Sequence, residues 1–192
     1  MKSYPVSANT SHLRLENAYG KGLGKAQHPF AQALMFAVIA GVATCHFLYY
    51  APRTIDDMYI FLRYAERLTQ GHGLTYNPGE HVEGFSSPVW LLFLTISHYV
   101  GIHPITWAKL LSVGAFGFLL GGIYRFGTQE LQLSRNYAAL ACISCVFNSY
   151  LVAWASWGLE TPLYLALMVW FAVWLTRILR SDSAPSRSET AW

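Results

Sequence analysis

The stretch PVWLLFLTISHYV, residues 88–100, decides how the chain is threaded through a membrane. It is apolar throughout, but a helix that crosses the hydrocarbon needs about 20 largely apolar residues. The stretch is therefore predicted to form a short helix that lies at the membrane surface without crossing it. Four other windows are long and apolar enough to span: residues 30–50, 104–124, 137–157 and 161–179.

The composition agrees with a membrane protein. Of the 192 residues, 54% are hydrophobic and 12% are charged, whereas a soluble domain is about one-quarter charged. We therefore predict an all-α, polytopic membrane protein with four transmembrane helices and amphipathic interfacial helices in the first outer loop, residues 51–103. Residues 30–180 would form the transmembrane module, and the polar segments 1–29 and 181–192 are expected to be cytoplasmic tails.

The positive charges orient the predicted spans. If residues 88–100 do not cross, nine of the thirteen lysines and arginines lie on one side of the membrane, together with both termini. If they do cross, every later span is inverted and the C-terminal arginines lie outside. Because cytoplasmic loops carry an excess of Lys and Arg, we expect the first arrangement, with the N-terminus in the cytoplasm.

The first outer loop opens with TIDD, residues 54–57, a capping-box pattern that predicts a helix over about residues 55–70. The apolar residues recur at helical spacing, with Arg67 on the polar side, so the helix should be amphipathic. Acids in a first turn contribute about 0.3–1 kcal/mol to a helix, and one carboxylate would suffice. Asp56 and Asp57 together repel each other unless a cation or a substrate lies against them. Capping and function both remain open for this pair.

A third acid, Glu160, lies in the short connection GLETP, residues 158–162, between two predicted spans. No basic residue lies close to it in the sequence, so a solvated carboxylate is one interpretation. In the four-span arrangement, however, Glu160 emerges on the same side as Asp56 and Asp57. Carboxylates from two loops would then form an all-oxygen site for a hard divalent cation such as Mg²⁺ or Mn²⁺.

Four further residues are candidates for substrate contacts: Glu80, His81, Glu83 and Lys109. The first three belong to the polar run NPGEHVEG, which begins with a proline–glycine turn. His81 could touch a phosphate or complete a metal site, although a lone histidine in a polar loop is more often solvated. Lys109 could contact a phosphate, but a lysine near the end of a span also reaches the interface by snorkelling.

Small and polar residues within the spans indicate close helix packing. The second span carries four glycines that would let neighbouring backbones approach: Gly114, Gly117, Gly121 and Gly122. Asn148 is expected to form a hydrogen bond between helices. The CxxC pair, Cys142 and Cys145, is a weak metal signal without a second pair, and small packing residues are the preferred interpretation.

These motifs together carry a family resemblance. The run DDMYIFLRYAERLTQGHGLTYNPGEHVEGFSSPVW, residues 56–90, followed by GLETPLY, residues 158–164, resembles the N-terminal part of C-type (GT-C) glycosyltransferases. It is similar to the bacterial group that includes the terminal arabinofuranosyltransferases, in which an acidic pair opens the first outer loop and an NPGE-x-VEG run follows. It also parallels oligosaccharyltransferase catalytic subunits, whose first outer loop holds two helices that do not span.

The resemblance implies a glycosyltransferase of the bacterial inner membrane. Such an enzyme transfers a sugar from a polyprenyl-phosphate donor to an acceptor on the outer face of that membrane. By this resemblance Asp57, with its neighbour Asp56, would be the catalytic carboxylate, and Asp57 and Glu160 would hold the divalent cation. The partners implied are the lipid-linked sugar and membrane lipid, and no nucleic acid.

Family members carry more spans than the four predicted here, so the sequence is also expected to be part of a truncated or split glycosyltransferase, with the remaining part as a partner. A different interpretation is a non-catalytic membrane protein that keeps this region as a lipid-binding or interaction module. A small transporter is disfavoured, because its charges would be expected near the bilayer midplane, whereas the acids here gather at one surface.

Overall fold

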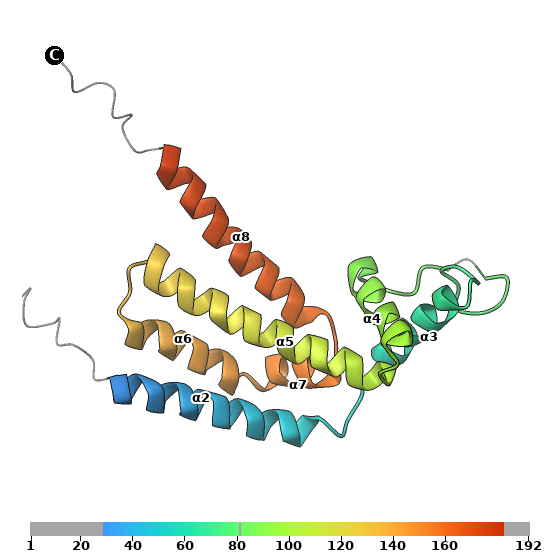
Figure 1. Cartoon of the computed structure of the whole chain (residues 1–192), viewed down its shortest axis with the longest axis horizontal. Helices are drawn as coiled ribbons and strands as arrows, with labels where there is room; N and C mark the ends of the chain where they lie inside the picture. The colour runs from blue at the N-terminus through green and yellow to red at the C-terminus, as the bar shows by residue number, and fades with distance from the viewer. Residues whose placement is uncertain (1–28, 81, 183–192) are drawn as a thin grey trace, which may run out of the picture. The chain divides into compact units, whose positions relative to one another are not determined.

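The helices of the protein fall where the apolar windows predict them (Figure 1). The computed structural model describes residues 29–80 and 82–182, and within these ranges it contains helices and no strand. The described residues from Phe36 onward belong to one unit. In chain order the elements are α2 (Pro29–Tyr50), α3 (Asp56–Thr69), α4 (Pro88–Val100), α5 (Pro104–Arg125), η1 (Phe126–Glu130), α6 (Arg135–Phe147), α7 (Ser149–Trp157) and α8 (Thr161–Asp182). The predicted tails lie almost wholly outside the described residues.

Several of these helices can span a membrane. By length and composition three of them qualify: Gln32–Tyr50 in α2, Pro104–Glu130 in α5 and η1, and Thr161–Arg180 in α8. The pair α6 and α7 is long and apolar enough to span only when its two helices are taken together. The 13 residues of α4 begin and end at the predicted bounds. The described chain is therefore all-helical, with three candidate spans, or four if the bent pair is one span.

The third predicted span is not one continuous helix, and this part of the prediction is wrong. Residues 137–157 fall into α6 and α7, which meet at an angle of 65°. Asn148 ends α6 and begins α7, and its side-chain Oδ1 accepts a hydrogen bond from the backbone N–H of Leu151 at 3.1 Å. Asparagine is a strong N-cap residue. Within the described residues the Asn148 side chain starts a new helix instead of making the predicted hydrogen bond between helices.

Helix α5 is the packing centre of the candidate spans. It lies between α8 on one side and α6 and α7 on the other (Figure 1). Of its four glycines only Gly122 meets a neighbour closely, because a Cβ there would lie 2.9 Å from Nε1 of Trp170 and 3.1 Å from Cγ1 of Val169. A Cβ at Gly114, Gly117 or Gly121 would meet nothing within 4 Å. The predicted close approach is thus found at one position, and three glycines face outward.

This difference gives a prediction with a matched neighbour. Gly122→Ala should lower the free energy of unfolding by about 1–3 kcal/mol, the usual cost of overpacking, because Trp170 is stacked on Phe118 and cannot move aside freely. Gly121→Ala should be neutral or slightly stabilising, because alanine is the better helix former. Unfolding of the detergent-solubilised chain, followed by circular dichroism, would measure both. Equal effects of the two substitutions would contradict the packing described here.

The two helices of the first outer loop pack against each other and against the start of α5. Their buried side chains form one core with the turn between α7 and α8: Met58, Phe61, Tyr64, Ala65, Trp90, Leu91, Leu94, Ala108 and Leu159. Arg67, expected on the polar side, is buried instead, and its Nε donates to Oγ1 of Thr75 at 3.0 Å. The loop after α3 folds back over the helix, which the helical periodicity does not show.

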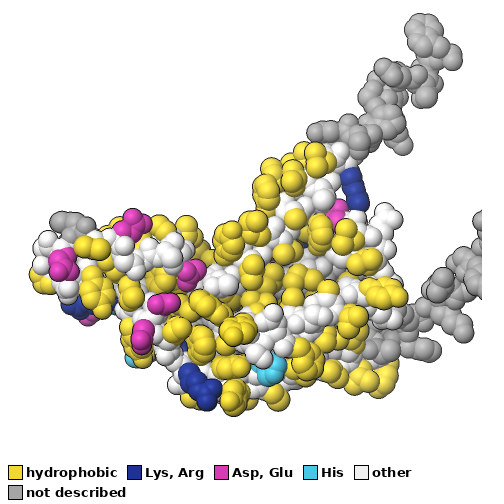
Figure 2. All heavy atoms as spheres, turned by 180° about the vertical axis from the view of Figure 1, so that it is seen from behind, with side chains coloured by type: hydrophobic (Ala, Val, Ile, Leu, Met, Phe, Trp, Pro, Cys, Tyr) yellow, Lys and Arg dark blue, Asp and Glu magenta, His cyan; other side chains and the backbone are white. Residues whose placement is uncertain are grey.

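The charged and apolar surfaces are separated. Acidic side chains gather over the part of the molecule that α3 and α4 form, whereas the spanning helices show largely hydrophobic side chains (Figure 2). On α8 the exposed residues include Leu167, Phe171 and Trp174. Apolar patches of this extent on a folded surface mark contact with a membrane or with another protein. The surface therefore agrees with helices that face lipid.

Candidate active site

The acidic pair lies in the first turn of α3, but not in the capping arrangement that the sequence predicts. Ile55 is the N-cap residue, it has no side-chain cap, and Asp56 begins the helix. Thr54 therefore does not cap the helix, and the capping box is wrong by one residue. Asp56 and Asp57 are both exposed, in the turn where the helix dipole favours negative charge.

The tight turn between α7 and α8 places the third acid. Gly158 ends α7 with φ +87°, and a Cβ there would lie 2.9 Å from Cε of Met58 and 3.1 Å from Cβ of Ala108. Oγ of Ser112, buried in α5, donates to the carbonyl of Leu159 at 2.7 Å. The turn is therefore fixed by α3 and α5 at once, and Glu160 follows it directly.

The carboxylate of Glu160 is half satisfied. Its Oε1 accepts a hydrogen bond from Oγ of Ser86 at 2.7 Å, which links the turn to the segment just before α4. Its Oε2 is buried and has no hydrogen-bond partner. An unsatisfied buried carboxylate oxygen is costly. A ligand, a proton or a cation placed against Oε2 would remove that cost.

Glu160 and Asp57 line the same cavity, which we call the carboxylate cavity. It encloses about 240 Å³, and its walls include Asp57, Ile60, Phe61, Ser86, Trp154 and Glu160. The carboxylates of two loops thus line one cavity. Asp56 is absent from this lining.

A second cavity adjoins the first and is more apolar. This α4–α8 groove encloses about 400 Å³ between the start of α4 and the first turns of α8, and it shares Ser86 and Glu160 with the carboxylate cavity. Val89, Leu163 and Leu167 supply hydrocarbon to it. Ser86 and Glu160 therefore lie at the boundary between a polar cavity and an apolar groove, an arrangement suited to an amphiphile.

Three helices begin around these two cavities. Asp56 and Asp57 lie in the first turn of α3, Glu160 immediately precedes α8, and Ser87 caps α4 by accepting the N–H of Trp90 at 3.3 Å. The N-terminus of a helix carries a partial positive charge and free N–H groups, and so favours a phosphate. The same place thus combines carboxylates for a cation with helix ends that favour an anion.

The residues present fit a magnesium ion in one specific way. Mg²⁺ is commonly held by one or two carboxylates, with substrate phosphates and water completing its shell. Asp57 and Glu160 would supply such a pair, and the partnerless Oε2 of Glu160 is the natural donor. Within residues 29–80 and 82–182 no group of three or more His, Cys, Asp or Glu side chains is placed to hold a metal by itself.

The other predicted contacts lie elsewhere. Glu80 is exposed and accepts a hydrogen bond from Nδ2 of Asn77 at 2.7 Å, and Glu83 borders a separate hollow with Val82 and Phe85. His81 lies outside the described residues. Nζ of Lys109 donates to the backbone carbonyls of Ala51 and Arg53, the latter at 2.9 Å. These two bonds tie the connection between α2 and α3 to α5, which gives Lys109 a structural role.

Two residues that the sequence analysis did not select shape the site: Ser86 and Tyr64. The hydroxyl of Tyr64 donates to the carbonyl of Val82 and accepts the N–H of Gly84 at 3.1 Å. It thereby fixes the segment that carries Ser86 against α3. The serine pair before Pro88 signals a helix N-cap, and Ser87 fills that role. Nothing in the sequence pairs Ser86 with Glu160.

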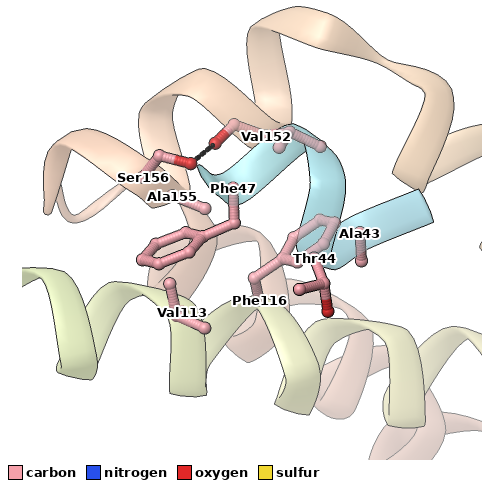
Figure 3. Close-up of a pocket in the computed structure, with 8 residues that line it drawn as sticks. All are labelled: Ala43, Thr44, Phe47, Val113, Phe116, Val152, Ala155 and Ser156. Carbon is pink, nitrogen blue, oxygen red and sulfur yellow. Dashed lines mark hydrogen bonds between the residues drawn. The ribbon is translucent and has the colours of Figure 1, made fainter. Parts of the chain in front are cut away.

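The spanning helices also enclose a small cavity of a different kind (Figure 3). It measures about 150 Å³ and lies between α2, α5 and α7, where Phe47, Val113 and Phe116 are among the residues that line it. Its two hydroxyl groups already donate to backbone carbonyls, Thr44 to Ala40 at 2.8 Å and Ser156 to Val152 at 2.7 Å. This cavity therefore offers packing space and no free polar group.

Comparison of the chain with models of known protein families, with characterised proteins and with solved structures found no match.

Proposed function

We propose that this chain is a membrane glycosyltransferase, or part of one, that takes a sugar from a polyprenyl-phosphate donor and transfers it to an acceptor hydroxyl. The observation that carries the proposal is the buried, partnerless Oε2 of Glu160 in a cavity that it shares with Asp57. The adjoining α4–α8 groove supports a donor with a long apolar chain, because the groove begins at the same carboxylate.

The roles of the side chains follow from their positions. The bond between the sugar carbon and the phosphate oxygen breaks, and the acceptor oxygen forms a new bond to that carbon. Asp57 takes the proton that the acceptor hydroxyl loses. A divalent cation between Asp57 and Glu160 would supply charge neutralisation for the departing phosphate. Asp56 remains outside the cavity lining and is assigned only to the N-terminus of α3.

The same proposal includes an orientation. The carboxylate cavity lies where α8 begins, and Arg177 and Arg180 lie towards the other end of that helix. Arg125 and Arg135 flank the turn at that same end of α5. Since basic residues favour the cytoplasmic side, the orientation we propose has the N-terminus in the cytoplasm and the carboxylate cavity on the outer face of a bacterial inner membrane.

Binding of the lipid phosphate tests the proposal without knowledge of the sugar. Glu160→Gln keeps the shape of the side chain and an acceptor for Ser86, but removes the charge that would hold the cation. We expect the magnesium-dependent part of decaprenyl-phosphate binding to the detergent-solubilised chain to fall by about tenfold or more, in line with losses at tuned metal sites. Isothermal titration with and without Mg²⁺ would measure it.

The control is Glu66→Gln. This substitution removes a carboxylate on the far side of α3, which is paired with Arg63 at 2.9 Å. It should leave magnesium-dependent binding at the level of the parent chain. Binding that does not depend on Mg²⁺, or a loss of equal size in both variants, would refute a cation site at Glu160.

A further inference from the structure

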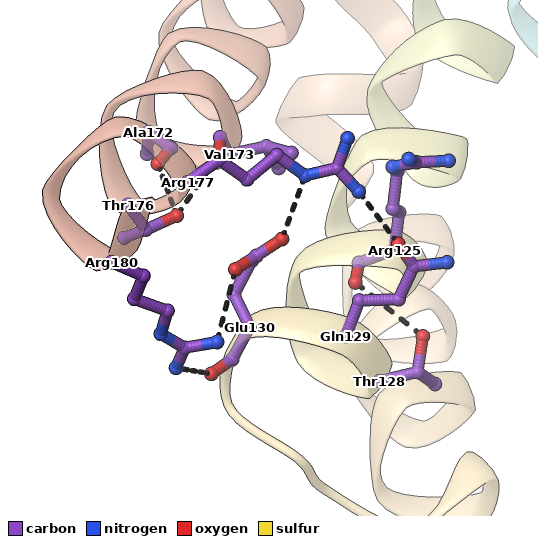
Figure 4. A network of polar contacts seen from close by, with 9 residues as sticks. All are labelled: Arg125, Thr128, Gln129, Glu130, Ala172, Val173, Thr176, Arg177 and Arg180. Atoms are coloured by element: carbon purple, nitrogen blue, oxygen red, sulfur yellow. Dashed lines mark hydrogen bonds and ion pairs between the residues drawn. The ribbon is translucent and has the colours of Figure 1, made fainter. Parts of the chain in front are cut away.

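The end of α5 opposite the carboxylate cavity carries guanidinium groups around one buried carboxylate (Figure 4). The side chain of Glu130 is only 4% exposed and accepts a hydrogen bond from Nε of Arg177 at 3.1 Å. Arg180 donates to the same carboxylate at 3.3 Å and to the backbone carbonyl of Glu130 at 2.6 Å. Nη2 of Arg177 also donates to Gln129 at 2.8 Å. Glu130 therefore gathers two arginines from α8 onto the end of α5.

A third arginine lies at the same place with an unused donor. Arg125 ends α5, and its Nε is buried without a hydrogen-bond partner. We call Arg125, Arg177 and Arg180 the guanidinium cluster. The cluster carries three positive charges, and Arg177 and Arg180 share one carboxylate, that of Glu130. Arg177 and Arg180 keep 48% and 55% of their side-chain surface exposed, so the excess charge is accessible.

The backbone at this end is also irregular. Residues Phe126–Glu130 form the π-helix η1, which interrupts the regular α-helical bonding as α5 ends. Such π-helical turns are rare and recur at functional sites. Here the turn carries Glu130 and Gln129, the two residues that accept hydrogen bonds from Arg177. The irregular turn therefore orients the acceptors that hold the cluster together.

An aromatic surface leads from the cluster into the span. The ring of Trp170 stacks on Phe118 with centroids 4.9 Å apart, and the Arg125 guanidinium carbon lies 5.8 Å from the Trp170 ring centroid. Phe171 and Trp174, on the same helix, are more than half exposed. Charged groups at the end of a span with exposed aromatic groups beside them suit a molecule with an anionic head and apolar chains.

We propose that the guanidinium cluster binds the phosphate of an anionic phospholipid, whose acyl chains lie along the exposed aromatic residues of α8. Arginine forks match phosphate oxygens in geometry and charge, and basic pockets between membrane helices bind anionic head groups. A phosphodiester would reduce the excess charge by contacting the exposed guanidinium groups of Arg177 and Arg180. This site lies at the other end of the helices from the carboxylate cavity and does not depend on the proposed transfer reaction.

Native mass spectrometry of the full chain in mixed micelles tests the site. We expect phosphatidylglycerol to be retained in preference to phosphatidylcholine, and Arg125→Gln and Arg177→Gln each to lower that retention about fivefold, the effect of about one basic residue at a membrane surface. Arg125→Lys keeps the charge and should retain at least half of the lipid. Circular dichroism spectra would show whether Arg125→Gln or Arg177→Gln has lost its helices. If one of them has, the other still tests the proposal.

The matched control is Arg53→Gln, which removes an arginine near the other end of the molecule, where Arg53 lies over the ring of Tyr49. Its phosphatidylglycerol retention should equal that of the parent chain. Equal retention of the two lipids, or an equal loss in the Arg53 and Arg125 variants, would overturn the proposal. Complete displacement of the lipid by soluble glycerol phosphate would overturn it as well, because the cluster would then bind a soluble phosphate.

Discussion

Replacing Asp57 by asparagine is expected to lower the rate of sugar transfer by about 10²- to 10⁴-fold, the range that a positioned general base contributes. Asparagine has nearly the same shape, but it cannot take the proton of the acceptor hydroxyl and carries no charge for a cation. Asp57 belongs to the lining of the carboxylate cavity. Membranes that contain the full chain, supplied with radiolabelled polyprenyl-phosphate sugars, would give the rate.

The neighbouring acid provides the matched control. Asp56→Asn removes a carboxylate from the same helical turn and changes the charge of α3 by the same amount, but Asp56 is outside the cavity lining. Transfer by this variant should stay within a few-fold of the parent rate. Undiminished transfer by the Asp57 variant, at normal membrane insertion, would exclude the role assigned to Asp57. An equal loss in both variants would indicate that the total charge of this helical turn matters, and not which of the two positions carries the carboxylate.

Alanine at Gly158 is expected to destabilise the protein by about 2–5 kcal/mol. Part of this cost, about 1–2 kcal/mol, comes from placing a side chain at φ +87°. The remainder comes from overpacking, because the new Cβ would meet Met58 and both the backbone and the side chain of Ala108. Unfolding of the solubilised chain in increasing concentrations of a denaturing detergent would measure the loss.

Gly101 separates the two contributions. It also has a positive φ, +69°, at the end of α4, but a Cβ there would meet nothing within 4 Å. Gly101→Ala should therefore show only the conformational cost of about 1–2 kcal/mol. If the two alanine variants are equally stable, the turn before Glu160 is not packed against α3 and α5 as described. The position of Glu160 beside Asp57 would then lose its structural basis.

The ends of most helices could be read from the sequence because strong local signals mark them. Pro88 and Pro104 begin α4 and α5 at the first helical position, and Gly101 ends α4 in the left-handed conformation. Proline is favoured at helix starts and glycine at helix ends. The length of the apolar runs then separated α4 from the spans, because hydrocarbon thickness sets a minimum for crossing.

Two features were not predictable in this way: the break in the helix at Asn148, and which of the α5 glycines packs closely against a neighbouring helix. A sum of hydropathy over 137–157 does not register that one asparagine can cap a new helix, as Asn148 does by accepting the N–H of Leu151. Likewise, Gly121 and Gly122 are adjacent and identical in the sequence. Only the position of α8 decides that Gly122 meets Trp170 while Gly121 is open.

For the candidate site, charge and span count predicted that Asp57 and Glu160 lie on one side of the membrane, and the structure shows that both line the carboxylate cavity. Charge and span count were not enough to place Lys109, which the structure ties to the backbone carbonyls of Ala51 and Arg53. Nor did they indicate Ser86, whose hydroxyl reaches Glu160 from a different loop. Hydrogen bonds between loops depend on how the helices beneath them pack, and a pattern within one segment carries no such information.

The sequence by itself determined that this protein is helical, that several of its helices suit a membrane, and that α4 is too short to cross. Those properties follow from the free energy of placing apolar side chains and backbone groups in hydrocarbon, which acts on each segment separately. Only the tertiary structure decided that Asp57 and Glu160 share a cavity while Asp56 does not, and that Glu130 gathers Arg177 and Arg180. These arrangements depend on contacts between distant segments, whose geometry is set by packing.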